Sequence, residues 1–426
     1  MSIAFLFIIF FALLIIGAPI AIALGASTFL ALVTFTPISP IEISSMVFEK
    51  IEHYSLMAIP MFILAGKLLS MGSSANRIIE FAKSIVGHLP GGLPMAAIFA
   101  SIIFAAVSGS SPATVVAIGS IMFVAIQEAG YPKKYAIGTI ATAGSLGILI
   151  PPSIVMIVFG VTAEVSIGKL FMAGIVPGIM IGAFMLIITY IGAKRLGFKR
   201  TKPASFKVRM QKMFDASWAL MTIVIVIGGI YGGIFTPTEA AAVAATWAFF
   251  VSMFIYRDIK WGDLYEIIFE SSKTTAMIMF IIANAMLFAH FLTMENIPQM
   301  ITETIIDWNV DVIMFLMFVN ILLIVAGAFM EPSAIIMIMV PLLLPVAVAL
   351  GINPIHFGIM ITINMELGMV SPPVGLNLFV TSSLTGMNMK DVIIATIPWT
   401  MTIFVGLMLV TYIPAISLWL PNLIYG

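Results

Sequence analysis

The 426-residue sequence contains no cysteine, and only 9% of its residues are charged. The missing cysteines exclude disulfides, thiol chemistry and cysteine metal sites. Soluble domains carry roughly a quarter of their residues as charged side chains, so the low charge content excludes a soluble fold. With a formal net charge of +0, the chain is not expected to bind nucleic acid.

Hydrophobic residues make up 62% of the sequence, and the mean hydropathy is +1.18. Apolar runs recur from Ile3 to Leu418 with polar breaks between them. A bilayer-spanning helix needs about 20 residues, so we expect an all-α polytopic membrane protein with roughly ten to twelve spans. The lipid bilayer is then its surrounding solvent.

One segment sets the expected orientation and divides the chain. It carries eight of the 19 basic residues and no acidic residue, namely Lys194, Arg195, Lys199, Arg200, Lys202, Lys207, Arg209 and Lys212. Such an excess is typical of loops on the cytoplasmic side. We therefore expect a first half over residues 1–193, a basic cytoplasmic loop over 194–214 and a second half over 215–426.

The two halves carry an internal repeat. Leu-Gly, three residues and then Pro-Pro occur at Leu146–Pro152 and again at Leu367–Pro373, 221 positions later. Other pairs keep this offset, namely Gly130 with Gly351, Lys169 with Lys390 and Pro177 with Pro398. An odd number of spans per half would make the halves inverted repeats, with the functional site at their interface near mid-membrane.

Each half is expected to contain a broken helix, near 147–152 and near 368–373. A double proline removes two backbone donors and clashes with the preceding turn, so a helix cannot continue through it. The freed carbonyl groups are tolerated at membrane depth only where protein or a water-filled cavity surrounds them. An unwound segment is therefore predicted in each half.

Each half also contains a polar tip within apolar sequence, at Ser108–Thr114 and at Ala326–Ser333. The apolar arms on either side are too short for two full spans. We therefore expect re-entrant helical hairpins near 94–126 and near 312–349, entering and leaving the membrane from one side.

Carbonyl and hydroxyl oxygens at these breaks are suitable ligands for a small hard cation such as sodium. Two sodium sites are expected, the first with Ser108, Ser110, Gly147, Ile150 and Pro152, and the second with Gly327, Gly368, Ser371 and Val374. Alternatively, these oxygens only accept hydrogen bonds from one another or from trapped water. No organic cofactor is expected.

A helix that starts after a break presents free N–H groups and a partial positive charge to an anion. A substrate carboxylate is therefore expected near Ser153 or Ser166 in the first half and near Asn377 in the second.

Ionisable residues within apolar sequence need a reason to be there. Glu331 and Glu366 flank the second expected sodium site, where they would balance a cation or take a proton. Glu239 is either a functional carboxylate or a residue that favours the first turn of a helix after Pro237. Snorkelling to the membrane interface explains Lys67 and is one interpretation of His290 and Glu295.

An intramembrane protease is the competing class. Its catalytic aspartates would lie at membrane depth, but the aspartates here fall at span ends and polar connections, and no HExxH motif occurs. A channel is disfavoured because neither the repeat nor the breaks indicate an open polar path. We therefore expect a carrier of a small organic anion and no enzyme.

The sequence resembles the large membrane subunit of the tripartite ATP-independent periplasmic (TRAP) transporters, of the DctM or SiaM type. The resemblance covers nearly the whole chain and is carried by Gly17–Ala21, Ile59–Gly66, Leu89–Leu93, Ser108–Thr114, Gly147–Pro152, Thr236–Ala242 and Gly368–Val374. It implies a sodium-driven importer in the bacterial inner membrane, supplied by a periplasmic substrate-binding protein. It also implies an elevator mechanism, in which a hairpin-bearing part slides against a scaffold.

The resemblance further implies a small four-helix membrane subunit of the DctQ or SiaQ type, expected here as a separate polypeptide. Ser166, Glu239 and Glu331 match positions that are tied to function in the family. Sialic acid is the first substrate expected and a C4-dicarboxylate the second. A stand-alone ion-coupled organic anion symporter is the alternative.

Overall fold

The computed structural model describes residues 1–425, apart from the side chain of Lys50, and these residues form helices and no strand. The first half contains α1 (Ser2–Ile15), α2 (Ile20–Phe35), α3 (Pro40–Ile51), α4 (Ala58–Met71), α5 (Ser74–Val86), α6 (Gly92–Ser108), α7 (Ser111–Glu128), α8 (Lys133–Ser145), α9 (Ile154–Thr162) and α10 (Ile167–Arg195). The second half contains α11 (Phe206–Ile223), α12 (Gly229–Tyr231), α13 (Pro237–Phe250), α14 (Asp263–Met294), α15 (Ile297–Asp307), α16 (Val312–Phe329), α17 (Pro332–Ala349), α18 (Pro354–Met369), α19 (Leu376–Thr385), α20 (Met389–Tyr412) and α21 (Ala415–Tyr425). The all-α fold is confirmed.

Within residues 1–425, nine helical segments are long and apolar enough to cross a membrane. They are Tyr54–Met71, Ser111–Glu128, Ile167–Arg195, Phe206–Tyr231, Pro237–Ile255, Asp263–Met294, Val312–Phe329, Pro332–Ala349 and Met389–Tyr412. Shorter apolar helices are α1, α2, α6 and α21. The number of long segments is thus below the expected ten to twelve, because several apolar runs are divided into shorter helices.

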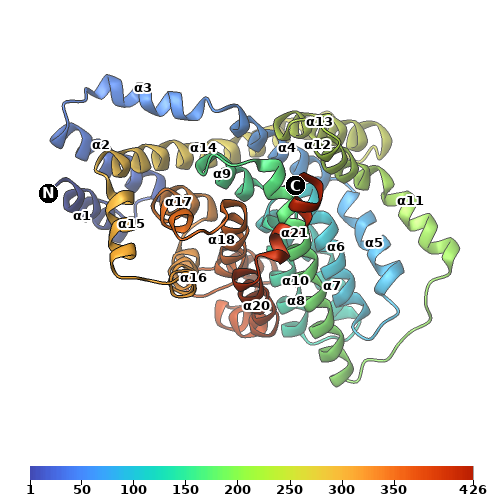
Figure 1. Cartoon of the computed structure of the whole chain (residues 1–426). Coiled ribbons are helices and arrows are strands. Elements are labelled where there is room, and N and C mark those ends of the chain that lie inside the picture. Colours follow the sequence, from blue (N-terminus) through green and yellow to red (C-terminus); the bar gives the residue numbers. More distant parts are fainter. Residues whose placement is uncertain (426) are drawn as a thin grey trace.

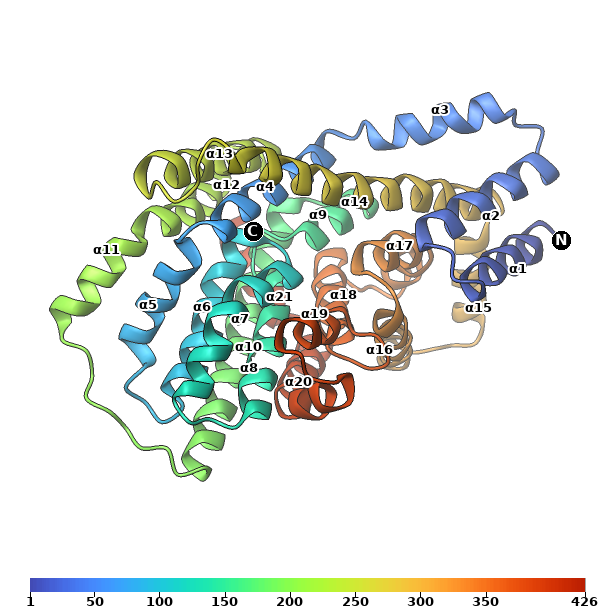
Figure 2. The ribbon, with the colours of Figure 1, turned by 180° about the vertical axis from the view of Figure 1, so that it is seen from behind.

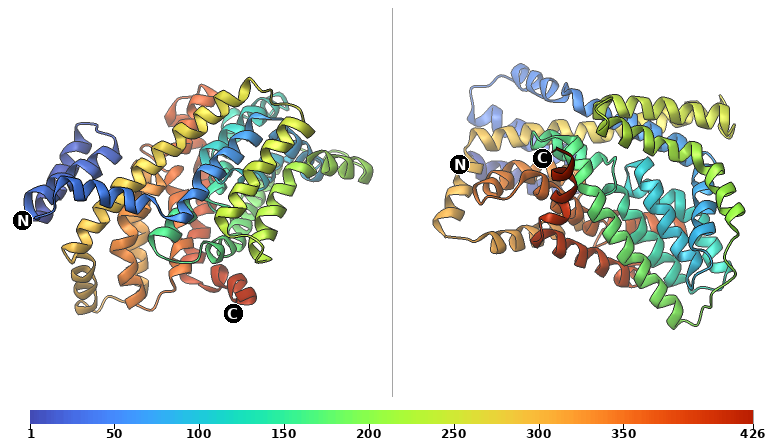
Figure 3. Two further views of the ribbon diagram at one scale, coloured as in Figure 1. Left: turned by 90° about the horizontal axis from the view of Figure 1, so that it is seen from above. Right: turned by 45° about the vertical axis from the view of Figure 1, so that its right-hand side comes forward.

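One outer layer consists of α2, α3, α4, α13 and α14, and we call these five helices the frame (Figures 1 and 2). The 32-residue α14 is about 48 Å long at 1.5 Å per residue. It contacts α2, α3 and α4 on its way across the molecule, and Figure 3 shows it running diagonally over the other helices. The frame also contacts both hairpins, since α4 packs against α6 and α14 packs against α17.

Helices of the first half contact helices of the second half in matched pairs. Helix α7 of the first hairpin packs against α19, and α17 of the second hairpin packs against α9. Helix α8 likewise packs against α20, while α18 packs against α10. Such reciprocal contacts are those of two repeats related by a pseudo-two-fold axis.

A side-chain contact marks this axis. Ser145 Oγ donates a hydrogen bond of 3.0 Å to Glu366 Oε1, and the two residues are 221 positions apart. This is the offset that relates the two double prolines. Equivalent positions of two repeats can meet only close to the axis that relates them, so the axis passes near this buried pair.

The hairpin arms are longer than the sequence suggested. Helix α6 has 17 residues, and α7, α16 and α17 have 18 each. These helices are about 25–27 Å long, close to the roughly 30 Å of a hydrocarbon core. The arms extend because α6 begins at Gly92, before the apolar run, and because α17 continues through Pro341 and Pro345.

The basic connection between the halves is shorter than the expected 194–214. Helix α10 continues to Arg195, and α11 begins at Phe206 because the Ser205 hydroxyl accepts a hydrogen bond from the Val208 N–H. Residues 196–205 alone therefore lie outside helices, and the C-terminal part of the basic segment is helical.

Candidate functional site

The tip of the first hairpin gathers three oxygen atoms. Helix α6 ends at Ser108, and Gly109 turns the chain with a φ of +59°, a conformation that favours glycine. Ser108 Oγ lies 2.9 Å from Thr114 Oγ1, which donates to the Ser110 carbonyl at 2.9 Å. Ser110 is the N-cap residue of α7, with Pro112 in the first turn. The tip is therefore compact and rich in oxygen.

The broken helix of the first half meets this tip. Helix α8 ends at Ser145, a 3₁₀ turn follows, and α9 begins at Ile154. The Ile154 N–H donates to the Gly109 carbonyl at 3.4 Å. A Cβ atom on Gly147 would lie 2.7 Å from the Ser110 carbonyl oxygen, so only glycine permits this approach.

Four of the five residues expected at the first sodium site are thus brought together. A Cβ atom on Gly109 would lie 2.9 Å from the Pro152 carbonyl oxygen, which places Pro152 beside Ser108, Ser110 and Gly147. Ile150 was expected to bind through its backbone; its N–H donates to Leu146 and its side chain lies against Gly178 of α10, and the role of its carbonyl stays a prediction.

The second half repeats this arrangement. A Cβ atom on Gly368 would lie 2.7 Å from Gly327 Cα, so the end of α18 touches the end of α16 backbone to backbone. The N–H groups of Val374 and Gly375 donate to the Ala328 carbonyl at 3.2 and 3.3 Å. The bond from Gly375 is the counterpart of the bond from Ile154 to Gly109.

Ser371 also lies in this second break, where its hydroxyl donates to the Leu367 carbonyl at 2.7 Å. The Ser371 carbonyl faces Gly375, on which a Cβ atom would lie 2.7 Å away. All four residues expected at the second sodium site therefore belong to one break and its adjoining hairpin tip.

Glu331 caps the second helix of its hairpin. Its carboxylate accepts hydrogen bonds from the Ser333 N–H and hydroxyl, both at 2.9 Å, and from the Ala334 N–H at 3.3 Å. These bonds satisfy donors that the first turn of α17 leaves free. Glu331 therefore combines a structural role with a position beside the second tip.

The expected substrate residues Ser153 and Ser166 lie at opposite ends of α9. Ser153 is buried, and its hydroxyl donates to Ile148 and accepts from the Met156 N–H. Ser166 caps α10 and lines a separate cleft of about 980 Å³ that also contains Glu164. The nine residues of α9 separate them by about 13 Å, so one carboxylate cannot contact both.

Asn377 connects the halves. It is buried in α19, and its side-chain amide donates to Ser111 Oγ of the first hairpin tip at 2.6 Å. Its Oδ1 has no hydrogen-bond partner among residues 1–425. Asn377 therefore fixes the second broken helix against the first hairpin.

Glu239 lies in a capping box at the start of α13. The Thr236 hydroxyl accepts from the Glu239 N–H at 3.3 Å, and the Glu239 carboxylate accepts from the Thr236 N–H at 2.8 Å. The side chain is exposed and does not line the cleft at the hairpin tips. This geometry favours the helix-start interpretation of Glu239.

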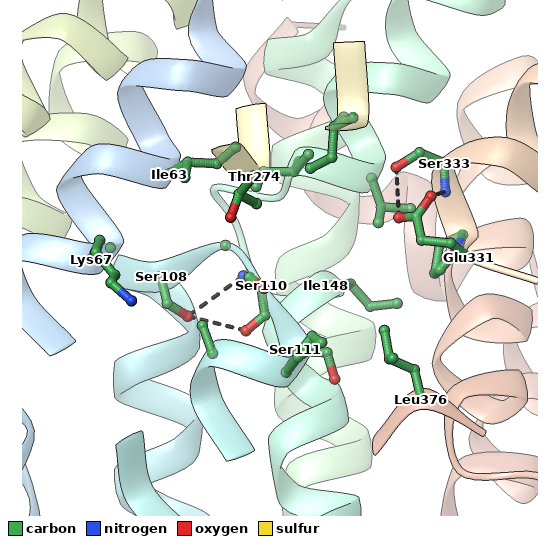
Figure 4. Close-up of a pocket in the computed structure, with 18 of the residues that line it drawn as sticks. Ile63, Lys67, Ser108, Ser110, Ser111, Ile148, Thr274, Glu331, Ser333 and Leu376 are labelled. Carbon is green, nitrogen blue, oxygen red and sulfur yellow. Dashed lines mark hydrogen bonds between the residues drawn. The ribbon is translucent and has the colours of Figure 1, made fainter. Parts of the chain in front are cut away.

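A cleft of about 380 Å³ lies between the frame and both hairpin tips (Figure 4). Its polar and charged lining comprises Lys67, Ser70, Ser108, Ser110, Ser111, Glu270, Ser271, Thr274, Glu331 and Ser333. Figure 4 shows the Ser108–Ser111 tip on one side and Glu331 with Ser333 on the other. The volume lies in the range of about 300–1,000 Å³ that is typical of small-molecule sites.

Sequence reasoning did not assign Lys67 to the site and missed one contact. Lys67 lines the cleft. The pairing of Ser145 with Glu366 was also missed, although the offset of 221 between them was visible in the repeat. Both side chains are fully buried, and Glu366 Oε2 has no hydrogen-bond partner in the described part of the chain.

A mainly apolar cleft with polar and charged side chains at two hairpin tips, within a bundle of spanning helices, is the architecture of a membrane transporter. The family model described as the DctM component of the tripartite ATP-independent periplasmic transporters matches residues 7–416. The chain therefore belongs to this family, as the resemblance implied, and is a multi-pass protein of the bacterial inner membrane.

Three relatives illustrate the family. The C4-dicarboxylate TRAP transporter large permease protein DctM of Pseudomonas aeruginosa is 50% identical over 422 residues, 99% of each chain. The isethionate TRAP transporter permease protein DctMQ of Oleidesulfovibrio alaskensis is 39% identical over 411 residues, 96% of this chain and 65% of that protein. The sialic acid TRAP transporter large permease protein SiaM of Vibrio cholerae is 33% identical over 416 residues, 97% of each chain.

A solved structure shares the fold. The YdaH transporter of Alcanivorax borkumensis superposes with a TM-score of 0.65 over 91% of this chain and 90% of that chain, at 15% sequence identity. A likeness at this identity supports the transporter fold and carries no substrate or ion across.

Proposed function

We propose that the chain is the translocating subunit of a sodium-driven importer of a C4-dicarboxylate, supplied by a substrate-binding protein. The observation that carries this proposal is the cleft that the frame shares with both hairpin tips, at the junction of the two repeats. Binding sites of repeat-built transporters lie at such junctions of broken helices.

The substrate proposal reverses the order expected from the sequence. Identity is 50% with the Pseudomonas dicarboxylate permease and 33% with the Vibrio sialic acid permease. This difference favours a C4-dicarboxylate over sialic acid for this chain.

The charge of the cleft supports coupling to a cation. Its charged lining consists of Lys67, Glu270 and Glu331, a net charge of −1 when all three are ionised. A bound dianion would change the net charge of the cleft from −1 to −3. Such uncompensated charge is costly in a site of low dielectric. Sodium ions at the oxygen clusters of the two tips would offset that repulsion, so substrate and cation would favour each other's binding.

The partners follow from the family. Its members are components of tripartite transporters, and the DctMQ relative is longer than this chain, which covers 65% of it. We propose a small membrane subunit of the DctQ type and a periplasmic substrate-binding protein as the other two components.

The proposed movement is of the elevator type. The hairpins and broken helices are joined to one another by hydrogen bonds, such as Asn377 to Ser111 and Ser145 to Glu366. The frame packs against both hairpins through α4 and α14 and shares the cleft with their tips. Sliding of the hairpin-bearing helices along the frame would carry the cleft contents across the bilayer while the repeat junction stays intact.

Reconstitution tests the class. Proteoliposomes that contain this chain and its small partner should accumulate a labelled C4-dicarboxylate only with an inward sodium gradient and with the binding protein outside. Accumulation without the binding protein would support the stand-alone symporter instead. Uptake that ignores the sodium gradient would refute sodium coupling.

Serine replacement tests the first sodium site. Ser108→Ala should raise the sodium concentration for half-maximal uptake, because it removes one of the three tip oxygens. Ser110→Ala should do the same, because it removes the hydroxyl of a cleft-lining residue while its carbonyl stays in place. A charge-assisted contact is worth about 1.5–3 kcal/mol, so an increase of about tenfold or more is expected. Ser120→Ala, on the exposed side of α7, is the control and should leave sodium activation unchanged. Normal activation in both tip variants would reject this site.

A further inference from the structure

Lys67 is held at the first hairpin tip by its neighbour in α4. A Cβ atom on Gly66 would lie 3.1 Å from both Cα and the carbonyl oxygen of Ser108, so glycine lets α4 approach the tip closely. Lys67 follows directly and lines the cleft, and Figure 4 shows it on the same side as Ser108 and Ser110. The ammonium group of Lys67 is thereby placed where α4 of the frame meets the tip of the first hairpin.

This ammonium group shares the cleft with two carboxylates but forms a direct ion pair with neither. Lys67 forms no ion pair with any residue in the described range 1–425, including the cleft residues Glu270 and Glu331. The Glu331 carboxylate already accepts three hydrogen bonds from its own helix start. Of the described residues that line the cleft, Lys67 alone carries a cationic side chain. An unpaired cation at membrane depth is costly and calls for an anionic partner.

A second observation points to the same ligand. Ser271 of α14 lines the cleft and is only 5% exposed, yet its hydroxyl has no hydrogen-bond partner among the described residues. Buried polar groups without a partner are uncommon and mark places where a ligand or water binds. The frame thus holds two donors without partners among the described residues at one cleft, an ammonium from α4 and, buried in the cleft wall, a hydroxyl from α14.

We propose that Lys67 and Ser271 bind one carboxylate of the transported anion and make the cleft selective for dianions. The inference rests on the proposed function and specifies which residues recognise the substrate. Both donors belong to the frame, whereas the oxygen clusters belong to the hairpins and breaks. Substrate affinity should therefore fall when Lys67 loses its charge, while sodium affinity measured without substrate should not fall.

Binding to the purified subunit measures this directly. The wild-type chain with its small partner is titrated with succinate in saturating sodium, and the rise of the thermal unfolding midpoint reports binding. Lys67→Gln should weaken the apparent succinate affinity at least tenfold, which corresponds to about 1.4 kcal/mol. Lys67→Arg should retain most of the affinity. Ser271→Ala should weaken binding by a smaller factor, because it removes a neutral donor.

Two comparisons isolate the charge effect. Butyrate matches succinate in chain length but has one carboxylate, so the preference for succinate over butyrate should shrink in Lys67→Gln. Lys273→Gln, an exposed lysine on α14 outside the cleft, is the control and should behave as wild type. In a sodium titration without succinate, Lys67→Gln should bind sodium at least as tightly as wild type, because a positive charge near the first tip is lost, and the response of each variant also shows that it is folded.

The outcomes are distinguishable. If wild type responds to succinate and Lys67→Gln responds with the same midpoint and the same preference over butyrate, Lys67 does not recognise the substrate. If Lys67→Gln does not fold, the other two variants decide the question. The proposal expects Lys67→Arg to retain succinate binding and Ser271→Ala to weaken it. Lost binding in Lys67→Arg together with wild-type binding in Ser271→Ala would overturn the shared carboxylate site. A wild-type chain that neither binds nor takes up dicarboxylates would refute the proposed function itself.

Discussion

The contact between Gly327 and Gly368 offers a test of the second sodium site at atomic scale. In Gly368→Ala, the new Cβ atom would lie 2.7 Å from both Cα and C of Gly327 and 2.9 Å from its carbonyl oxygen. Ordinary contact begins at 3.4 Å, so the hairpin tip must retreat from the broken helix by about 0.7 Å. The opposing atoms are backbone, so no side-chain rotation can relieve the overlap.

Two consequences of this displacement can be calculated. Overpacking of this kind costs about 1–3 kcal/mol of stability. Metal–ligand distances tolerate only about 0.2 Å, so a shift of 0.7 Å would remove the second-tip oxygens from a shared coordination sphere. Sodium activation of uptake should therefore require at least about tenfold more sodium, equivalent to roughly 1.4 kcal/mol.

The assay combines thermal unfolding of the purified protein, with and without sodium, and uptake as a function of sodium concentration. Gly228→Ala is the matched control, because a Cβ atom at Gly228 meets nothing within 4 Å. Gly368→Ala should lose most of its sodium-induced stabilisation, and Gly228→Ala should lose none. A folded Gly368→Ala protein with wild-type sodium activation would show that these backbone oxygens do not hold the ion.

Four further substitutions, in two pairs, test the roles of the buried carboxylate Glu366 and the capping carboxylate Glu239. Ser145→Ala should lower the thermal unfolding midpoint, because it removes the hydrogen-bond partner of buried Glu366 at a cost of about 1–3 kcal/mol. Glu366→Gln, which can keep that bond, should be closer to wild type, and equal stability of Ser145→Ala and wild type would contradict the pairing. Thr236→Ala should cost about 1 kcal/mol by removing a helix cap. Glu239→Gln should leave the uptake per folded molecule unchanged, whereas lost uptake in a stable Glu239→Gln protein would assign the carboxylate a functional role.

The local breaks in the fold could be predicted because their causes are local. Double prolines stop helices wherever they occur, and the structure interrupts helices between Ser145 and Ile154 and between Met369 and Leu376. The positions of the hairpin turns also followed from short polar sequences within apolar ones. The lengths of the arms did not, because an apolar helix continues beyond its apolar run when the flanking residues can pack.

Contacts between distant segments were beyond the reach of sequence patterns. The position of Lys67 in the cleft could not be predicted, because nothing in its neighbourhood indicates that Gly66 packs against Ser108. Ser153 and Ser166 lie close in sequence, yet α9 places them at its two ends. The side chain of Ile150 packs toward α10, and a single sequence does not reveal that direction.

The repeat explains the geometry of the cleft. The two halves of the chain differ in sequence at equivalent positions, and these differences make the charge of the cleft uneven between its two sides. Ser110 and Glu331 are 221 positions apart and are both the N-cap residue of the second hairpin helix. Ser145 and Glu366 stand in the same relation. In both pairs the first half has a neutral hydroxyl and the second half a carboxylate.

Lys67 adds a positive charge on the side of the first tip, opposite Glu331. A dianion in the cleft would therefore be drawn toward the first tip, where hydroxyl and ammonium donors lie, and would be repelled by Glu331. Of the two proposed sodium sites, the one at the second tip would be favoured more strongly for the same reason. Two symmetric halves would present the same field from both sides, so this divergence is what allows one cleft to bind an anion and a cation together.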